Sequence, residues 1–155
     1  MKIEFMERAV NLARKGMLAG DGGPFGAVLV RDGLVLGEGW NRVLATNDPT
    51  AHGEVVAIRD ACAREKTFSL EGCEIYTTGQ PCPMCLGAIY WAGIRGIYYG
   101  FSIEDAADIG FGDEEFFHEF SIPRAERKIP ENELGRDLAL KLAAEYSAMP
   151  DRQLY

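Results

Sequence analysis

Short apolar runs alternate with segments of helical periodicity between residues 26 and 101, and this alternation constrains the fold more than any other feature of the chain. Four runs predict strands, at residues 27–30, 34–38, 75–78 and 96–101. Asp32-Gly33 separates the first two, and this pair favours the tight turn of an antiparallel hairpin. The later strands alternate with helices. We therefore expect a three-layer α/β/α fold in which helices cover both faces of one sheet.

Helical spacing predicts the layers that cover this sheet. The expected helices lie at residues 3–18, from Pro49-Thr50 through Ala61, from Pro81-Cys82-Pro83 through Ile89, and at residues 134–146. Gly20 closes the first helix and Pro150 terminates the last. His52 and Glu54 fall in the first turn of the second helix. Two of the helix starts therefore carry residues that can bind metal or move protons.

Length and charge narrow the class of protein. A chain of 155 residues fits one domain, so we predict a single domain over residues 1–155. The formal net charge of −8 opposes the basic surface that nucleic-acid binding usually requires, so nucleic acid is an unfavoured partner. The N-terminus lacks the apolar core of a signal peptide, and no apolar run reaches the roughly 20 residues that span a bilayer. We expect a cytoplasmic protein with no membrane partner.

The four cysteines of such a protein are typically free thiols or metal ligands. Cys82 and Cys85 are three residues apart at a predicted helix start, so both thiols lie near the positive end of the helix dipole, which favours thiolates. Thiolates bind zinc, and His52 can supply a third ligand. Cys62 and Cys73 have no ligand-like neighbour. We therefore predict one Zn²⁺ per subunit, with water or hydroxide as its fourth ligand, rather than a closed structural site.

Glu54 makes this metal pattern a catalytic one. A lone Cys-x-x-Cys is also typical of a redox dithiol, and a glutamate in a first turn is also favoured by the helix dipole alone. Together, the residues from His52 to Cys85 form the His-x-Glu and Pro-Cys-x-x-Cys pattern of zinc deaminases. Zinc lowers the pKa of its bound water towards about 7. Glu54, close to the metal without being a ligand, can carry protons to the ring nitrogen and the departing ammonia.

These residues belong to a wider resemblance, which covers nearly the whole chain. The sequence resembles the cytidine deaminase-like superfamily, and within it the deaminases of free bases, most closely the bacterial guanine deaminases. The resemblance rests on residues 22–28, 47–52 and 81–92 and on the terminal Tyr155. It implies a cytidine deaminase-like fold with a mixed sheet of about five strands between helices. It also implies a homodimer whose C-terminal segment is exchanged between subunits, so that Tyr155 reaches the active site of the partner.

The resemblance further implies contacts with the base. Asn41 would hydrogen-bond the base, and Phe25 and Trp91 would line the pocket or stack on the ring. From the residues alone, core packing explains Phe25 and Trp91 equally well, and that alternative stays open.

A second proton carrier is also implied, and Asp113 is the residue that aligns with it. Glu114 and Glu115 follow directly and stay open as alternatives. The chain departs from the usual pattern at Gly53, where the superfamily usually has Ala, and at Gly79-Gln80, where it usually has Cys-Glu. We expect zinc binding to survive the first change, whereas the second removes a charge near the metal loop.

One function is expected, and three alternatives remain. The expected reaction is zinc-dependent hydrolytic deamination of a free nucleobase, namely guanine to xanthine and ammonia. A deaminase of cytosine, another aminopurine or an amino-triazine would use the same residues. A tRNA adenosine deaminase would need basic residues to hold the RNA backbone, and the C-terminal third is rich in Asp and Glu instead. The last alternative is a non-catalytic binding module in which zinc only holds two helices together.

Overall fold

The computed structural model describes residues 2–155, and the chain divides into two compact units. The first unit extends to Phe117 and contains every strand of the described chain, and the second comprises His118–Tyr155. The strands are β1 (Gly26–Arg31), β2 (Leu34–Trp40), β3 (Glu74–Gly79) and β4 (Gly96–Phe101). The helices of the first unit are α1 (Lys2–Ala19), α2 (Val43–Thr46), α3 (Gly53–Glu65), α4 (Pro83–Trp91) and α5 (Ile103–Asp108), and α6 (Asp113–Ser121) crosses the boundary between the units.

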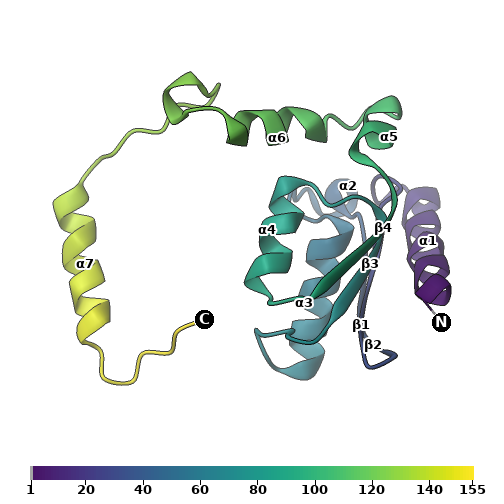
Figure 1. Ribbon diagram of the computed structural model, residues 1–155, viewed down its shortest axis with the longest axis horizontal. Helices are drawn as coiled ribbons and strands as arrows, with labels where there is room; N and C mark the ends of the chain where they lie inside the picture. Colours follow the sequence, from purple (N-terminus) through teal and green to yellow (C-terminus); the bar gives the residue numbers. More distant parts are fainter. Residues whose placement is uncertain (1) are drawn as a thin grey trace. The chain divides into compact units, whose positions relative to one another are not determined.

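The first unit has the predicted three layers. Figure 1 shows α1 on one face of the sheet and α3 and α4 on the other. The strand order is β2-β1-β3-β4, with β1 antiparallel to both of its neighbours and β3 parallel to β4. Asp32 and Gly33 have φ angles of 52° and 81°, the left-handed backbone that the predicted hairpin turn requires. Because parallel neighbours need a crossover, α4 follows β3 directly and leads back to β4.

Alternate residues of β1 face the two helical layers. Ala27 and Leu29 pack in the larger core, with residues of α3, β3 and α4. Val28 and Val30 pack in the smaller core, with Ala9 of α1. A strand covered on both faces is apolar at every position, which explains why this run shows no alternation of apolar and polar residues.

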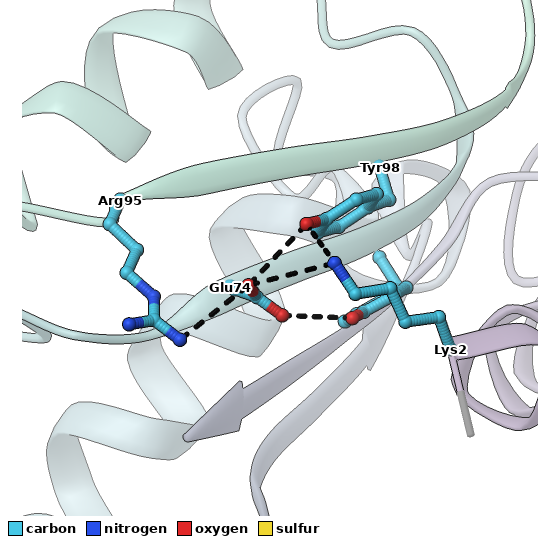
Figure 2. Close-up of polar contacts among 5 residues, drawn as sticks. Lys2, Glu74, Arg95 and Tyr98 are labelled. Atoms are coloured by element: carbon cyan, nitrogen blue, oxygen red, sulfur yellow. Dashed lines mark hydrogen bonds and ion pairs between the residues drawn. The ribbon is translucent and has the colours of Figure 1, made fainter. Parts of the chain in front are cut away.

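A polar cluster around Glu74 ties the start of α1 to β3 and β4 (Figure 2). The Glu74 carboxylate accepts hydrogen bonds from Tyr76 at 2.9 Å and from Tyr98 at 3.4 Å, and it lies 3.5 Å from the Arg95 guanidinium. Lys2 donates to the Tyr98 hydroxyl. Burial, followed by the hydrogen bond to Glu74, raises the pKa of Tyr76 to about 12. This cluster lies at the opposite end of β3 from the loop that leads into α4.

The prediction of about five strands is wrong in its count, because residues 2–155 form a sheet of four. After β4 the chain enters α5 instead of a fifth strand. The Ser102 hydroxyl accepts from the Asp105 N–H at 3.2 Å, and the Asp105 carboxylate accepts from the Ser102 N–H at 2.8 Å. This capping box stabilises a helix start directly after the sheet, and the chain continues into α6.

The second unit contains the short helix η1 (Arg124–Glu126), α7 (Arg136–Ala148) and the C-terminal tail. The helix predicted at residues 134–146 is confirmed by α7, none of whose residues is buried. The prediction of a single domain with an exchanged C-terminal segment stays a prediction. Across residues 2–155 no helix is both long enough and apolar enough to cross a bilayer. The expected cytoplasmic location also stays a prediction.

Candidate active site

Two helix starts bring His52, Cys82 and Cys85 together. His52 is the N-cap residue of α3 and Cys82 is the N-cap residue of α4; both have extended backbone, and neither side chain makes a capping hydrogen bond. Pro83 occupies the first helical position of α4, where a missing N–H is tolerated. The candidate ligand atoms of the three side chains all lie within 4.8 Å of one another. The structure thus joins the three residues that the sequence singled out as metal ligands.

This set of donor atoms fits zinc. His52 Nδ1 lies 3.6 Å from the Cys82 sulfur and 3.5 Å from the Cys85 sulfur. Tetrahedral bonds of about 2.1 Å to nitrogen and 2.3 Å to sulfur would separate such atoms by about 3.6 Å. Within residues 2–155 no fourth His, Cys, Asp or Glu joins the group. One imidazole and two thiolates leave a fourth position for water or substrate, which is the pattern of a catalytic zinc site.

Hydrogen bonds within the group favour a thiolate at Cys82. A hydrogen bond from the Cys85 thiol, together with one from His52, lowers the pKa of Cys82 to about 4. The pKa of His52 is raised, chiefly by its hydrogen bond to Cys82. The pKa of Cys85 is raised because its thiol donates to Cys82 and because it is buried. A coordinated zinc ion deprotonates both thiols, and the positive ends of two helix dipoles support that charge.

Glu54 lies beside this group without belonging to it. It occupies the first turn of α3, is only 4% exposed, and lines the same cavity as His52 and Cys82. Burial raises the pKa of its carboxyl group. A buried carboxyl group next to the open position of a metal can take a proton from one partner and give it to another.

A cavity of about 410 Å³ opens onto these residues, a volume within the range of pockets that hold small molecules. It brings together six of the predicted side chains: Phe25, Asn41, His52, Glu54, Cys82 and Asp113. The remaining lining residues are Gly22, Gly23, Val43, Leu44, Pro49, Gln80, Phe111 and Phe116. All of these residues belong to the first unit, so the cavity is built within one compact body.

Three predicted residues are not among the described residues that line the cavity: Cys85, which belongs to the metal group, and Trp91 and Tyr155, which were predicted to contact the base. Trp91 is 74% exposed at the end of α4. Tyr155 is the last residue of the second unit and is also exposed. Their contacts with the base stay predictions.

Asn41 is held in the cavity wall by one local hydrogen bond and by contacts with the loop before β1. Its N–H donates to the Phe25 carbonyl at 2.7 Å, and its Oδ1 accepts from the Val43 N–H at 3.2 Å. Gly22 makes room for this side chain, because a Cβ atom at position 22 would stand 2.0 Å from Asn41 Oδ1. With Oδ1 engaged, the amide nitrogen of Asn41 is available to donate to a ligand.

Three carboxylates begin α6, and Asp113 is the one that lines the cavity. Burial, followed by the negative charge of Cys82, raises the pKa of Asp113. Glu114 and Glu115 are exposed. The geometry therefore favours Asp113 as the carboxylate of the site.

The sequence interpretation did not assign Gln80, Phe111 or Phe116 to the site, although it had noted Gln80 as a departure near the metal loop. Gln80 lies between β3 and α4, and its side-chain oxygen accepts from the Ile103 N–H at 3.3 Å, which ties the metal loop to α5. Phe111 lies in the loop two residues before Asp113, and an aromatic residue that close to a candidate acid was an available signal. Phe116 had no such signal, because its helix was not predicted.

A family of zinc-binding deaminases matches most of the chain. The model of the cytidine and deoxycytidylate deaminase zinc-binding region matches residues 1–101. The guanine deaminase of Bacillus subtilis (strain 168) is 52% identical over 126 residues, which cover 81% of each protein. The tRNA-specific adenosine deaminase of Agrobacterium fabrum is 46% identical over 101 residues, which cover 64% of each.

Solved structures show the same fold. The X-ray structure of guanine deaminase from Bacillus subtilis matches with a TM-score of 0.94 at 44% identity, and the match covers 98% of this chain and 97% of that one. A structure of guanine deaminase from Nitrosomonas europaea matches with a TM-score of 0.66 at 31% identity, covering 94% of this chain and 84% of that one.

Proposed function

The chain belongs to the family defined by the cytidine and deoxycytidylate deaminase zinc-binding region, and on this premise we propose that it deaminates guanine to xanthine and ammonia. It is a zinc-dependent aminohydrolase, with His52, Cys82 and Cys85 as its candidate zinc site. The observation that carries the choice of guanine is the 52% identity to the Bacillus subtilis guanine deaminase over 81% of the chain. The cavity of about 410 Å³ supports a free base as the substrate, because a small molecule fits a pocket of that size.

His52, Cys82 and Cys85 would hold the metal. When bound, zinc supplies a water acidic enough to act as a nucleophile at neutral pH. In the overall reaction a C–O bond forms from this water, the C–N bond to the amino group breaks, and the nitrogen leaves as ammonia.

The side chains around the cavity orient the base and move the protons. Glu54 accepts a proton from the attacking water and delivers it to the ring nitrogen beside the reacting carbon. Asp113 acts as a second carrier, which takes the remaining proton of the attacking oxygen and delivers it to the departing amine. Asn41 donates from its amide nitrogen to an acceptor on the base, and Phe25 forms an apolar wall against the ring.

Two of the three alternatives differ from this proposal in substrate rather than in mechanism, and the third is not catalytic. Another amino-base would use the same zinc and the same Glu54. Likeness to the tRNA-specific adenosine deaminase of Agrobacterium fabrum supports an RNA substrate, but that match covers only 64% of this chain, and the net charge of −8 opposes binding to a polyanion. A non-catalytic zinc module does not account for a buried carboxyl group beside an open metal position.

Ammonia release from a panel of substrates tests the proposal. The panel contains guanine, adenine, cytosine, an amino-triazine, guanosine, and adenosine in an RNA hairpin. We expect guanine to give the highest kcat/KM and the RNA hairpin to give no release. Preference for the hairpin would assign the protein to tRNA adenosine deamination, whereas no release from any substrate by zinc-loaded protein would favour the binding module.

We also propose that the protein is a homodimer in which the C-terminal segment is exchanged between subunits. Leu138, Leu142 and Tyr146 recur every four residues along α7 and are all exposed in the single chain. An apolar stripe of this kind needs a partner surface. The Tyr146 hydroxyl donates to the Gln153 carbonyl at 3.1 Å, so the tail is held to α7 and would accompany it, bringing Tyr155 to the partner's cavity.

Deletion of residues 153–155 is expected to lower kcat/KM for guanine by at least about tenfold, because the base would lose a group that closes its pocket. Zinc content should stay at one per chain, since His52, Cys82 and Cys85 are untouched. Tyr155→Phe, which keeps the ring, is the matched variant and should retain most of the activity. Kinetics of the deletion variant that equal wild type would remove Tyr155 from the site, and a monomer by light scattering would refute the exchange.

A further inference from the structure

We propose that Phe111 is a positioning residue. Its ring packs against Gly23 and Phe25, and this contact holds Asp113 at the cavity. This inference rests on the proposed function, because it concerns the second proton carrier of that reaction. It assigns a role to a residue that neither the ligand pattern nor the resemblance had pointed to.

The ring of Phe111 is held by two close neighbours. Its centroid lies 4.7 Å from that of Phe25, and the two planes meet at 89°, an edge-to-face contact of the kind that aromatic pairs prefer. Position 23 must be small, because a Cβ atom there would stand 2.7 Å from Phe111 Cζ and 3.0 Å from the nearest atom of the Phe25 ring. The Phe25 ring in turn packs against Phe101 at the end of β4, with centroids 5.6 Å apart. Phe111 is therefore held, through Phe25, against the end of β4.

The backbone of Phe111 is fixed as well. Its N–H donates to the Ala106 carbonyl at 3.0 Å, and Ala106 is buried in α5. Gly110, with φ of 97°, makes the left-handed turn that brings the chain back from that helix. Ring and backbone together fix Phe111 two residues before Asp113.

On the other side of Asp113 the chain is less firmly held. No residue of α6, all of which the structure describes, is buried. Phe116, the aromatic residue of α6 that lines the cavity, is 52% exposed. Phe111 is half-buried and lies outside both core clusters, so its packing contacts are with the cavity residues Gly23 and Phe25. These observations point to a role for the ring in the site rather than in the fold.

Position matters for a proton carrier because transfer requires hydrogen-bond contact, and a misplacement of about 1 Å can cost about 100-fold in rate. Aspartate has a short side chain, so the location of its carboxylate is set largely by its backbone. Loss of the Phe111 anchor should therefore act on Asp113 and on the chemical step, while the contacts of the base with Asn41 and Phe25 persist.

A double-mutant cycle on the zinc-loaded enzyme tests the inference, with Phe111→Ala, Asp113→Asn and the double variant measured on guanine. We expect Phe111→Ala to lower kcat by at least about tenfold with KM changed less than about threefold. The double variant should be no slower than Asp113→Asn alone, because both changes remove the same interaction. Phe111→Leu, which keeps an apolar side chain at this position without extending beyond the phenylalanine ring, should retain more of kcat than Phe111→Ala.

Two glycine substitutions provide a matched pair. Gly23→Ala fills the space beneath the Phe111 ring and should reproduce the loss of kcat. Gly112→Ala adds the same methyl group directly after Phe111, where no atom outside the neighbouring residues lies within 4 Å, and should leave kcat unchanged. Zinc content and the thermal midpoint of unfolding are measured for every variant, so that a folding defect is distinguished from a loss of kcat.

The possible results separate the two proposals. A wild-type kcat in Phe111→Ala would overturn the positioning role alone. The positioning role would also be overturned if Phe111→Ala raised KM and its loss of kcat/KM multiplied with that of Asp113→Asn in the double variant, because Phe111 would then contact the base. A wild-type kcat in Asp113→Asn would remove the second carrier and the positioning role with it. No ammonia from any base with the wild-type enzyme would instead refute the proposed function itself.

Discussion

Glu54→Gln is expected to lower kcat on guanine by at least about 100-fold while zinc content stays at one per chain. General acid–base catalysis contributes about 10²-fold to 10⁴-fold, and an amide cannot accept and return a proton as a carboxyl group does. The substitution keeps the shape of a side chain that is only 4% exposed, so it should leave the fold intact. Steady-state ammonia release, metal analysis and the thermal midpoint measure the three quantities.

Glu65→Gln is the control for this variant. Glu65 ends the same helix and forms a surface ion pair with Arg31 at 2.7 Å, away from the cavity residues. Exposed ion pairs contribute at most about 1 kcal/mol to stability, so this variant should keep the activity of wild type. If Glu54→Gln remained as active as Glu65→Gln, the proton transfers assigned to Glu54 would be wrong and the cavity would need another base.

The candidate zinc ligands could be singled out from the sequence because each of them is marked by a local pattern. The spacing of Cys82 and Cys85 places both thiols on one turn, and His52 and Glu54 share the first turn of another helix. What joins the two helix starts is the sheet. Both helices cover the same face, and each begins at the same edge of the molecule, where β3 ends and where β1 starts near Phe25. The layered fold predicted from the strand pattern therefore also predicted the site.

The cavity wall could not be predicted in the same way, because its contacts join residues far apart in the chain. The fit of Gly22 to Asn41 and that of Gly23 to Phe111 depend on backbone approaches that no local pattern reports. Packing of this kind is decided by tenths of an ångström rather than by hydrophobic periodicity. The sequence identifies the residues of the cavity wall but does not show which residues they contact.

The expected fifth strand failed for a different reason. That expectation came from resemblance, although a local signal contradicted it: Ser102 and Asp105 have the spacing of a capping box. The weak apolar pattern after Ile103 was compatible with short helices, and α5 buries only Ile103 and Ala106. The local pattern after β4 therefore favours short helices over a further strand at this point in the chain.

Cys85→Ser is expected to abolish both zinc binding and turnover. Cys85 is fully buried and its sulfur lies 3.5 Å from His52 Nδ1, so its loss leaves two protein ligands for a metal that needs three beside its open position. A hydroxyl group is a poor substitute, since zinc prefers thiolate, imidazole and carboxylate donors. Purified protein should contain well under one zinc per chain, and ammonia release from guanine should fall to background. The thermal midpoint should also fall, because metal that binds only the folded state stabilises that state.

Cys62→Ser separates the loss of a ligand from the loss of a thiol. Cys62 is half-buried on α3 and packs against the larger core, and it is outside the metal group, so this variant should keep full zinc and turnover despite some loss of stability. Chelation followed by added zinc should restore wild type and Cys62→Ser but not Cys85→Ser. Full zinc occupancy in Cys85→Ser would show that the metal has another ligand. Full turnover in its absence would show that the amino group is removed without this site, which would overturn the reaction as assigned to His52, Cys82 and Cys85.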